Sequence, residues 1–412
     1  MMNKRVVLIL IAAFAVTRIA NVWLAFTPPH LGGAYGDLLK YETWATAVVD
    51  DNRGAYGEVA IEYPPGVLPF IAAARLLPFG SAYAHQFIWL MALLDVGCFA
   101  GVMGLARRWG SPLGAWTWIA GGLLLGPIIY LRLDLIPATA TIVAIQRASV
   151  ARWGQAGGWL GFGALAKVYP GFLILLALPV APMWRRFLLG VGVSAAVLLL
   201  PVVAMGSGDE LVRDVIGYHT ARGIQVESTW GFLLLGASKF GYSMYPNFQF
   251  GANEVVSGIS PLLKTFGSLL SLSSLAAGVW IVRRHVARGE TPFLAAAMFG
   301  TLALLMFFGT VFSPQFAIWL VALGAAALAH PLTPRLRVAV LTVVLIAPLT
   351  QIVFYVAIGD VLAPFYEGGT EAGAPLKLAL LGIRNFIVLG AGIATLTALA
   401  ARPRPAESNG LR

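Results

Sequence analysis

The residues of this sequence that could carry chemistry stand in six short polar motifs between long apolar runs. In several of these motifs a carboxylate lies close to a cationic side chain. Such a set suits the transfer of a phosphate-linked sugar, because cations neutralise the phosphate while a carboxylate accepts the proton of an attacking hydroxyl. The motifs read GAYGDLLKYE at 33–42, IEYPPG at 61–66, RLD at 132–134, AKVYPG at 166–171, YHTARGIQVES at 218–228 and SPQF at 313–316.

Each motif also has a structural explanation. The EYPP run at 62–65 is expected above all to cap and steer the apolar segment that follows it. Arg132 and Asp134 are two residues apart, so they either neutralise each other at a helix end or leave Arg132 free for a phosphate. Lys167 could extend to the membrane interface, although the helix break beside it favours a functional role. The remaining polar residues of the long segments would be ordinary solvated side chains if they stood alone.

Signals for metals and cofactors are weak. The five histidines are scattered without the spacing of metal ligands, and the segments expected outside the membrane hold no D-x-D pair. Neither G-x-x-x-x-G-K-[ST] nor G-x-G-x-x-G occurs, and the single Cys98 excludes a disulfide framework or a cysteine cluster. We therefore predict no cofactor and no metal. Because the expected inner loops are short basic turns, any sugar donor must be carried by a lipid.

The composition determines which elements can position these motifs. The chain has 412 residues, of which 59% are hydrophobic and 11% are charged. A soluble domain carries about 25% charged residues, so a soluble enzyme is excluded and the apolar residues must face lipid. The net charge of +10 does not indicate a nucleic-acid partner, because Lys and Arg stand in short clusters between apolar runs. That pattern is typical of cytoplasmic loops in a membrane protein.

The apolar runs predict an all-α polytopic membrane protein with about twelve spans and both termini in the cytoplasm. The run at 5–26 is interpreted as a retained first helix rather than a signal peptide, and 64–79 as a re-entrant or interfacial segment. The apolar run 155–184 is expected to break near Lys167 into two short helices. The twelve spans are 5–26, 82–106, 113–131, 134–150, the two halves of 155–184, 187–206, 258–282, 291–310, 314–330, 335–356 and 376–400.

We treat the whole chain, 1–412, as one membrane domain. Its first outer loop covers 27–80, and a long outer loop after the seventh span covers 207–257. A short cytoplasmic tail is expected at 401–412. The charge pattern puts the polar motifs on the outer face, where they would form one site.

The order of the motifs from 37 to 316 resembles glycosyltransferase family 87 of the GT-C class, which includes polyprenol-phosphate-mannose-dependent mannosyltransferases. The resemblance implies a GT-C fold in a bacterial plasma membrane, with the active site on the outer face. It also implies an inverting, metal-independent transfer from a polyprenyl-monophosphate sugar. No larger acceptor-binding domain is expected, since little sequence follows the last predicted span.

The resemblance also implies roles for individual residues. Asp37 best matches the general base, and Glu42 is its rival. The donor phosphate is expected to bind Lys167, Arg132, His219 and Arg222. A third group is expected to contact the acceptor or the sugar, or to support the site: Tyr41, Glu62, Tyr63, Asp134, Tyr169, Gln225, Glu227 and Gln315.

Several alternatives stay open at this point. Mannose is favoured, but a polyprenyl-phosphate arabinose or glucose is the nearest rival, since no residue identifies a particular hydroxyl. The acceptor is a glycolipid or another glycan, and membrane lipids are the other expected partners. A different class of function is a transporter or flippase for a lipid-linked sugar. It is disfavoured because the polar residues gather at one face rather than at the midplane.

Overall fold

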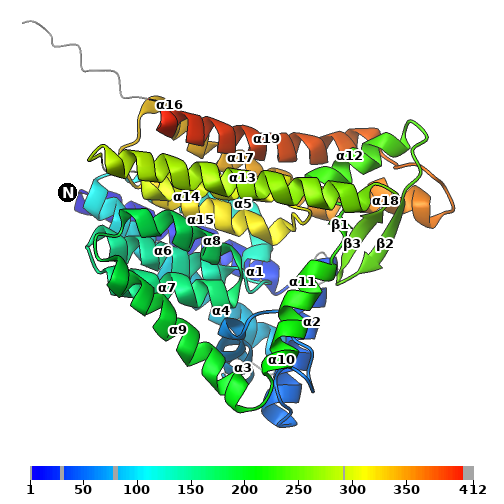
Figure 1. The fold of residues 1–412 in the computed structure, drawn as a ribbon, viewed down its shortest axis with the longest axis horizontal. Helices are drawn as coiled ribbons and strands as arrows, with labels where there is room; N and C mark the ends of the chain where they lie inside the picture. The colour runs from blue at the N-terminus through cyan, green and yellow to red at the C-terminus, as the bar shows by residue number, and fades with distance from the viewer. Residues whose placement is uncertain (1, 28–31, 78–81, 291–292, 402–412) are drawn as a thin grey trace, which may run out of the picture.

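Apolar helices build most of the molecule, and the computed structural model describes residues 2–27, 32–77, 82–290 and 293–401 (Figure 1). Within these residues, six helical stretches are long and apolar enough to cross a membrane, by length and composition. A helix needs about 20 such residues to cross a bilayer, so they indicate a membrane-embedded protein. The six are α1 (Lys4–Ala25), α4 (Tyr83–Trp109), α9 (Trp184–Ala204), α13 (Ser260–Ala287), the consecutive helices over Pro334–Tyr366, and α19 (Pro375–Ala400).

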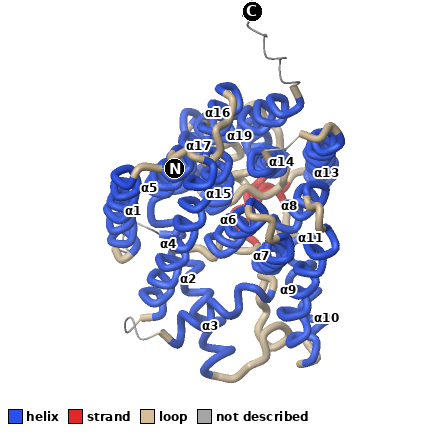
Figure 2. Tube along the Cα trace, turned by 90° about the vertical axis from the view of Figure 1, so that its left-hand side faces the viewer, coloured by secondary structure: helices blue, strands red, loops and turns tan. Residues whose placement is uncertain are grey.

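The other helices are shorter than a full span, so the count of twelve spans stays a prediction. α15 lies near the centre of the bundle in the view along it, and all its residues are buried (Figure 2). The α-helices not yet given bounds, including the three that make up Pro334–Tyr366, are α2 (Gly32–Ala45), α3 (Leu68–Leu76), α5 (Leu113–Leu125), α6 (Leu135–Ser149), α7 (Trp153–Ala166), α8 (Tyr169–Ala177), α10 (Gly208–Leu211), α11 (Tyr218–Ala221), α12 (Thr229–Ser238), α14 (Leu294–Phe308), α15 (Ala317–Leu328), α16 (Pro334–Leu341), α17 (Val343–Ile352) and α18 (Ile358–Tyr366). Short 3-10 helices cover Pro65–Val67, Gly126–Ile129, Leu178–Val180 and Pro314–Phe316, and π-helices cover Thr46–Asp50, Val212–Gly217 and Val353–Ala357.

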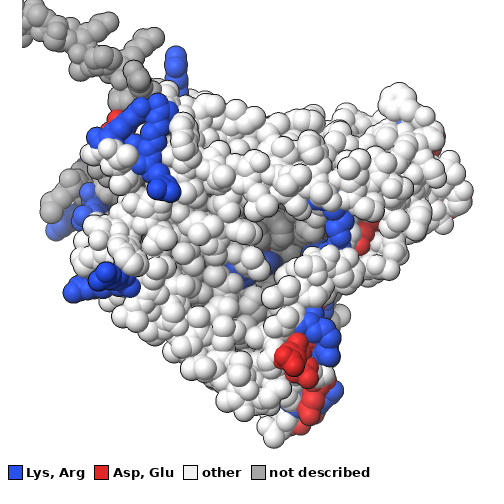
Figure 3. Space-filling model, in the orientation of Figure 1, with Lys and Arg blue, Asp and Glu red and all other residues white. Residues whose placement is uncertain are grey.

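The outer surface of the bundle is apolar. Large aliphatic side chains project outward from α1, α9 and α13, for example Ile19, Leu189 and Leu262. In Figure 3 the broad middle of the molecule is almost free of charged side chains, whereas Lys and Arg gather at the end on the left. Exposed aliphatic side chains in water are unfavourable over such an area, so this belt suits contact with lipid.

Helix α7 packs against α9 through glycines, and this contact positions the end of α7. A methyl group on Gly157 would lie 1.9 Å from the carbonyl oxygen of Phe187, and one on Gly190 would lie 2.0 Å from that of Gly154. Small residues allow the two backbones to approach, as they do in other membrane helix pairs.

A buried polar cluster joins α1, α4 and α5. The Arg18 guanidinium donates to the Asp95 carboxylate at 2.7 Å and to the carbonyls of Trp118 and Ile119. Asp95 also accepts from the Trp118 indole at 2.8 Å and from the Tyr130 hydroxyl at 2.7 Å. A charge at membrane depth is normally a candidate for function. Here the carboxylate is saturated by these donors, so the cluster is a structural link between helices.

The structure is consistent with the expected all-α membrane protein, and the segment 207–257 adds a small antiparallel sheet to it. Its strands are β1 (Ile224–Gln225), β2 (Tyr245–Gln249) and β3 (Ala252–Val256), in the order β1-β3-β2. In the register of β1 with β3, Gln225 pairs with Glu254. The sheet lies at the right-hand end of the bundle in Figure 1.

The irregular segments can be compared with the sequence predictions. Helix α3 has nine residues, a length of about 14 Å, so it is too short to cross a bilayer. Helix α7 ends at Ala166 and α8 begins at Tyr169, so the chain breaks at Lys167 as predicted. Residues 402–412 of the expected tail, and 28–31 and 78–81 of the expected first loop, lie outside the described residues.

Candidate functional site

A cavity of about 810 Å³ lies where α2, the sheet and the ends of several bundle helices meet. Figure 3 shows a hollow in the middle of the molecule with Lys or Arg side chains at its wall. Its polar lining comes from segments far apart in the sequence, because the chain returns repeatedly to this end of the bundle. Among its lining residues are Asp37, Lys40, Glu62, Tyr63, Arg132, Lys167, Tyr218, His219, Arg222, Gln225, Glu227, Ser313 and Gln315.

Asp37 and Arg132 form an ion pair at this cavity. Asp37 lies on α2, and Arg132 lies in the turn before α6. The Arg132 side chain is 5% exposed, whereas that of Asp37 is 32% exposed. The carboxylate is therefore the accessible member of the pair, and the guanidinium forms the wall behind it.

Lys167 lies in the break between α7 and α8 and points into the protein. Its ammonium lies 2.9 Å from an oxygen of Asp134, a fully buried carboxylate. It also lies 4.9 Å from the ring centre of Tyr63 and 5.3 Å from that of Phe316, within the range of cation–π attraction. The interpretation of Lys167 as a side chain that extends to the interface is therefore wrong, because its charge is satisfied inside.

Arg132 and Asp134, which the sequence suggested could neutralise each other, form their ion pairs with other residues. Arg132 pairs with Asp37, and Asp134 pairs with Lys167. The two side chains form ion pairs with different partners, and the charge of Asp134 also favours the charged form of Arg132.

The EYPP run both packs and lines the cavity. Glu62 accepts from the Lys40 ammonium, and the two form an ion pair. A methyl group on Gly66 would lie 2.6 Å from the Leu165 carbonyl oxygen, so this turn rests directly on the backbone that precedes Lys167. The run therefore packs against the bundle as expected, but no side chain caps the 3-10 helix Pro65–Val67 that follows it, and Glu62 and Tyr63 line the cavity.

Arg222 and His219 come from α11 and the residue after it. The Arg222 guanidinium lies 4.0 Å from Glu254, which also accepts from the Gly223 amide at 2.9 Å. Desolvation, with the nearby charges of Lys167 and Arg222, lowers the pKa of His219 to about 4. His219 is therefore neutral at pH 7 in this structure and can offer a phosphate a hydrogen bond.

Gln225 and Glu227 link the sheet to the start of the 3-10 helix Pro314–Phe316. The Gln225 amide donates to Glu227 at 2.8 Å, and its carbonyl accepts from the Phe312 amide at 3.1 Å and from the Ser313 hydroxyl at 3.2 Å. The other Glu227 oxygen is buried without a hydrogen-bond partner. Burial raises the pKa of Glu227 to about 7, against the opposing effect of nearby arginines.

Arg384, on α19, supports this loop from behind. Its guanidinium donates to the Glu227 backbone carbonyl and to the Asn385 side chain, and lies 4.0 Å from the ring centre of Phe312. Sequence reasoning missed this residue. The signal was a lone arginine within the apolar run 376–400, which is costly unless it serves a purpose.

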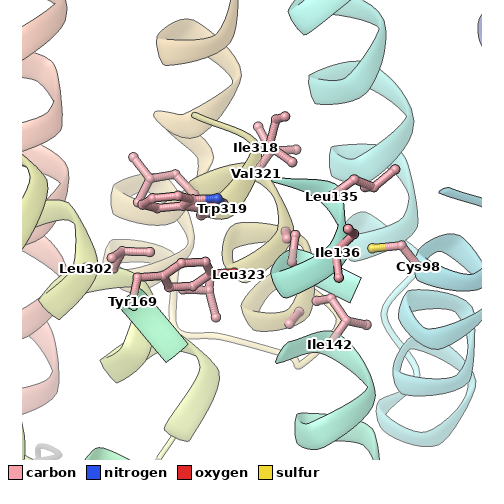
Figure 4. Packing of buried hydrophobic residues seen from close by; sticks show 14 of the residues in the cluster. Cys98, Leu135, Ile136, Ile142, Tyr169, Leu302, Ile318, Trp319, Val321 and Leu323 are labelled. Carbon is pink, nitrogen blue, oxygen red and sulfur yellow. The ribbon is translucent and has the colours of Figure 1, made fainter. Parts of the chain in front are cut away.

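Four of the predicted residues do not line the cavity. Asp134 lies behind Lys167, and Tyr41 is buried against Tyr63. Tyr169 stacks on Trp319 in the core, with ring centres 4.3 Å apart, as Figure 4 shows. Glu42 instead exerts its charge on Arg75 and Tyr83, and this weakens its case as the alternative base.

Lys40 is a further cavity residue that was absent from the predicted set. It stands three residues after Asp37, so on a helix both side chains share a face. That spacing was available in the sequence. Glu254 could not be inferred, because its position depends on the register of two short strands.

Comparison with known proteins gives no identification. No protein-family model matches the sequence, and no curated protein matches it.

Proposed function

We propose that this protein transfers a sugar from a polyprenyl monophosphate to a hydroxyl acceptor at the cavity, in the manner of family 87 of the GT-C class. The observation that carries the proposal is the contact of Asp37 with Arg132 at the wall of a cavity between apolar helices. It brings an accessible carboxylate and a buried cation to one place. Those are the two groups that transfer from a phosphate-linked sugar requires.

In the proposed reaction Asp37 removes the proton of the acceptor hydroxyl. The acceptor oxygen then forms a bond to the anomeric carbon, and the bond from that carbon to the phosphate oxygen breaks in line with it. The electron pair of that bond remains on the phosphate, which leaves as a polyprenyl monophosphate with one more negative charge. Configuration at the anomeric carbon is inverted by this single displacement.

The ion pair of Arg132 supports this assignment through charge balance. Asp37 loses its negative charge when it accepts the proton, and the leaving phosphate gains one. A cation that contacts Asp37 can therefore stabilise the phosphate without any change in the total charge around it. Lys167 and Arg222 also line the cavity and are the other proposed cationic contacts of the phosphate.

The apolar part of the cavity wall suits the polyprenyl chain. Phe172, Phe354 and Ile358 line it next to the charged residues. A lipid-linked donor needs such a route, since its chain stays in the membrane while its phosphate enters the polar site. We place this site at the outer face of a bacterial plasma membrane, with both termini in the cytoplasm, because the arginine-rich helix ends lie at the opposite end of the bundle.

The test is a transfer assay with purified protein in detergent, a hydroxyl acceptor, and a panel of polyprenyl-phosphate mannose, arabinose and glucose. We expect product from one donor, and a loss of at least about 100-fold in Asp37→Asn. Asp50→Asn is the matched control, since Asp50 lies on the same segment and pairs with Arg75 rather than lining the cavity.

Absence of product with every donor would refute the transferase and favour a flippase, which moves lipids between leaflets but makes no new bond. Full activity in Asp37→Asn would instead refute the assignment of the base.

A further inference from the structure

A second cavity, of about 560 Å³, lies at the opposite ends of α6, α7, α14 and α15 from the candidate site. Its wall is mostly apolar and includes the buried Ala296 and Ala326. Trp109 and Trp153 also line it. Trp is enriched where membrane helices reach the lipid headgroups.

An arginine-lined cavity of about 420 Å³ adjoins the apolar one, and Arg108 and Ser149 line both. Arg147 and Arg152 are the other cations of its wall. No carboxylate is among the lining residues of either cavity, and among the described residues none of the three arginines has an acidic partner within 4 Å. The Nε of Arg147 is buried without a hydrogen-bond partner.

The candidate site also holds buried guanidinium atoms without a hydrogen-bond partner, such as Nε of Arg132 and of Arg222, but its cations lie beside carboxylates. There, Arg132 pairs with Asp37 and Lys167 pairs with Asp134. Arg108 and Arg152 are exposed, so solvent screens much of the repulsion among the three arginines, whereas the buried Nε of Arg147 has lost its hydration without gaining a partner. An anion in this cavity would balance the positive charges and accept a hydrogen bond from Arg147. Guanidinium groups match phosphate oxygens particularly well, because their planar forks donate two parallel hydrogen bonds.

We propose that the two adjoining cavities bind one anionic phospholipid. Its phosphate would contact Arg108, Arg147 and Arg152, and one acyl chain would occupy the apolar cavity. The volume of the apolar cavity is within the range of about 300–1,000 Å³ typical of sites for small ligands. Basic pockets between membrane helices bind anionic headgroups by the same physical principle. The site is separate from the cavity of Asp37 and does not depend on the reaction proposed there.

The test measures binding of phosphatidylglycerol to the purified protein by native mass spectrometry, with phosphatidylcholine and inorganic phosphate as comparison ligands. We expect phosphatidylglycerol to bind at least about tenfold more tightly than either, because only it supplies both an unbalanced anion and a chain. Arg147→Gln should weaken its binding about tenfold or more. Ala296→Phe should do the same by filling the apolar cavity, and Ala327→Phe serves if that variant does not fold.

The matched control is Arg185→Gln with Arg186→Gln. These two arginines begin α9 at the same end of the bundle, but they line neither cavity. Their replacement should leave phosphatidylglycerol binding unchanged. An equal loss in this control would show that diffuse positive charge attracts the lipid, and the proposal would fail. It would also fail if inorganic phosphate bound as tightly as the lipid and Ala296→Phe had no effect, since the site would then be one for a free anion.

Discussion

Replacement of Glu227 by Gln should change how stability depends on pH. The pKa of Glu227 is about 7 in the folded protein, against an ordinary value of 4.5. Between these two pH values Glu227 keeps its proton in the folded protein but releases it in the unfolded chain. The contribution of Glu227 to the free energy of unfolding therefore decreases as pH rises from about 4.5 to 7, and it no longer changes above pH 7. The difference is 7 − 4.5 = 2.5 pH units, which at 1.36 kcal/mol per unit corresponds to about 3 kcal/mol. Gln carries no titrating proton, so Glu227→Gln lacks this decrease.

The assay is thermal unfolding of the purified protein in detergent between pH 4.5 and pH 8. Other groups titrate equally in both proteins, so the difference between variant and wild type isolates Glu227. We expect Glu227→Gln to gain about 3 kcal/mol relative to wild type across this interval. Glu367→Gln, at an exposed residue, is the control, and its stability should depend on pH in the same way as that of the wild type. A difference between Glu227→Gln and wild type that stays constant with pH would refute the reasoning.

Three further substitutions test the packing and the charge pairs. Gly157→Ala should destabilise the protein by at least about 1–3 kcal/mol in thermal unfolding, because its methyl group would collide with the backbone carbonyl of Phe187. Gly158→Ala is the control and should be tolerated, since the nearest atom to its methyl group would be 3.6 Å away. Asp95→Ala should cost about 3–5 kcal/mol, because it leaves a buried guanidinium unpaired. Lys167→Met should cost a similar amount of stability, because it leaves the buried carboxylate of Asp134 without its cation. Adding Asp134→Asn to this variant should restore stability but not donor binding. If donor binding were restored as well, Lys167 would not belong to the phosphate site.

The sequence was sufficient to predict that distant polar residues would meet. Asp37 and Lys167 are separated by several apolar helices, yet both line one cavity. This could be foreseen because polar side chains are costly in lipid, and an alternating topology returns them to the same end of a bundle. The helix break at Lys167 was equally visible, since Pro170 and Gly171 stand three and four residues after it and proline starts a helix better than it continues one.

The pairing of the charges could not be predicted in the same way. Arg132 has Asp134 two residues away, but its partner is Asp37, on a helix that lies far earlier in the chain. Such a choice depends on the relative placement of elements to within an ångström, and the hydrophobic pattern does not encode that placement. Likewise, β1 and β3 are short strands within a polar segment. The alternation of apolar and polar residues that predicts a strand is absent there, so the sheet that brings Glu254 to Arg222 could not be foreseen.

The two ends of the bundle differ in how their cations are satisfied, and this difference constrains the proposed reaction. At the candidate site Lys40, Arg132, Lys167 and Arg222 each lie within 4.0 Å of a carboxylate. A phosphate that enters such a site meets cations that already face carboxylates, although Nε of Arg132 and Nε of Arg222 have no hydrogen-bond partner. Its charge therefore competes with a carboxylate for each cation. Asp37 is the partner best suited to give way, because it is the more exposed member of its pair and because proton transfer in the reaction removes its charge. Arg132 would then follow the negative charge from the base to the leaving phosphate.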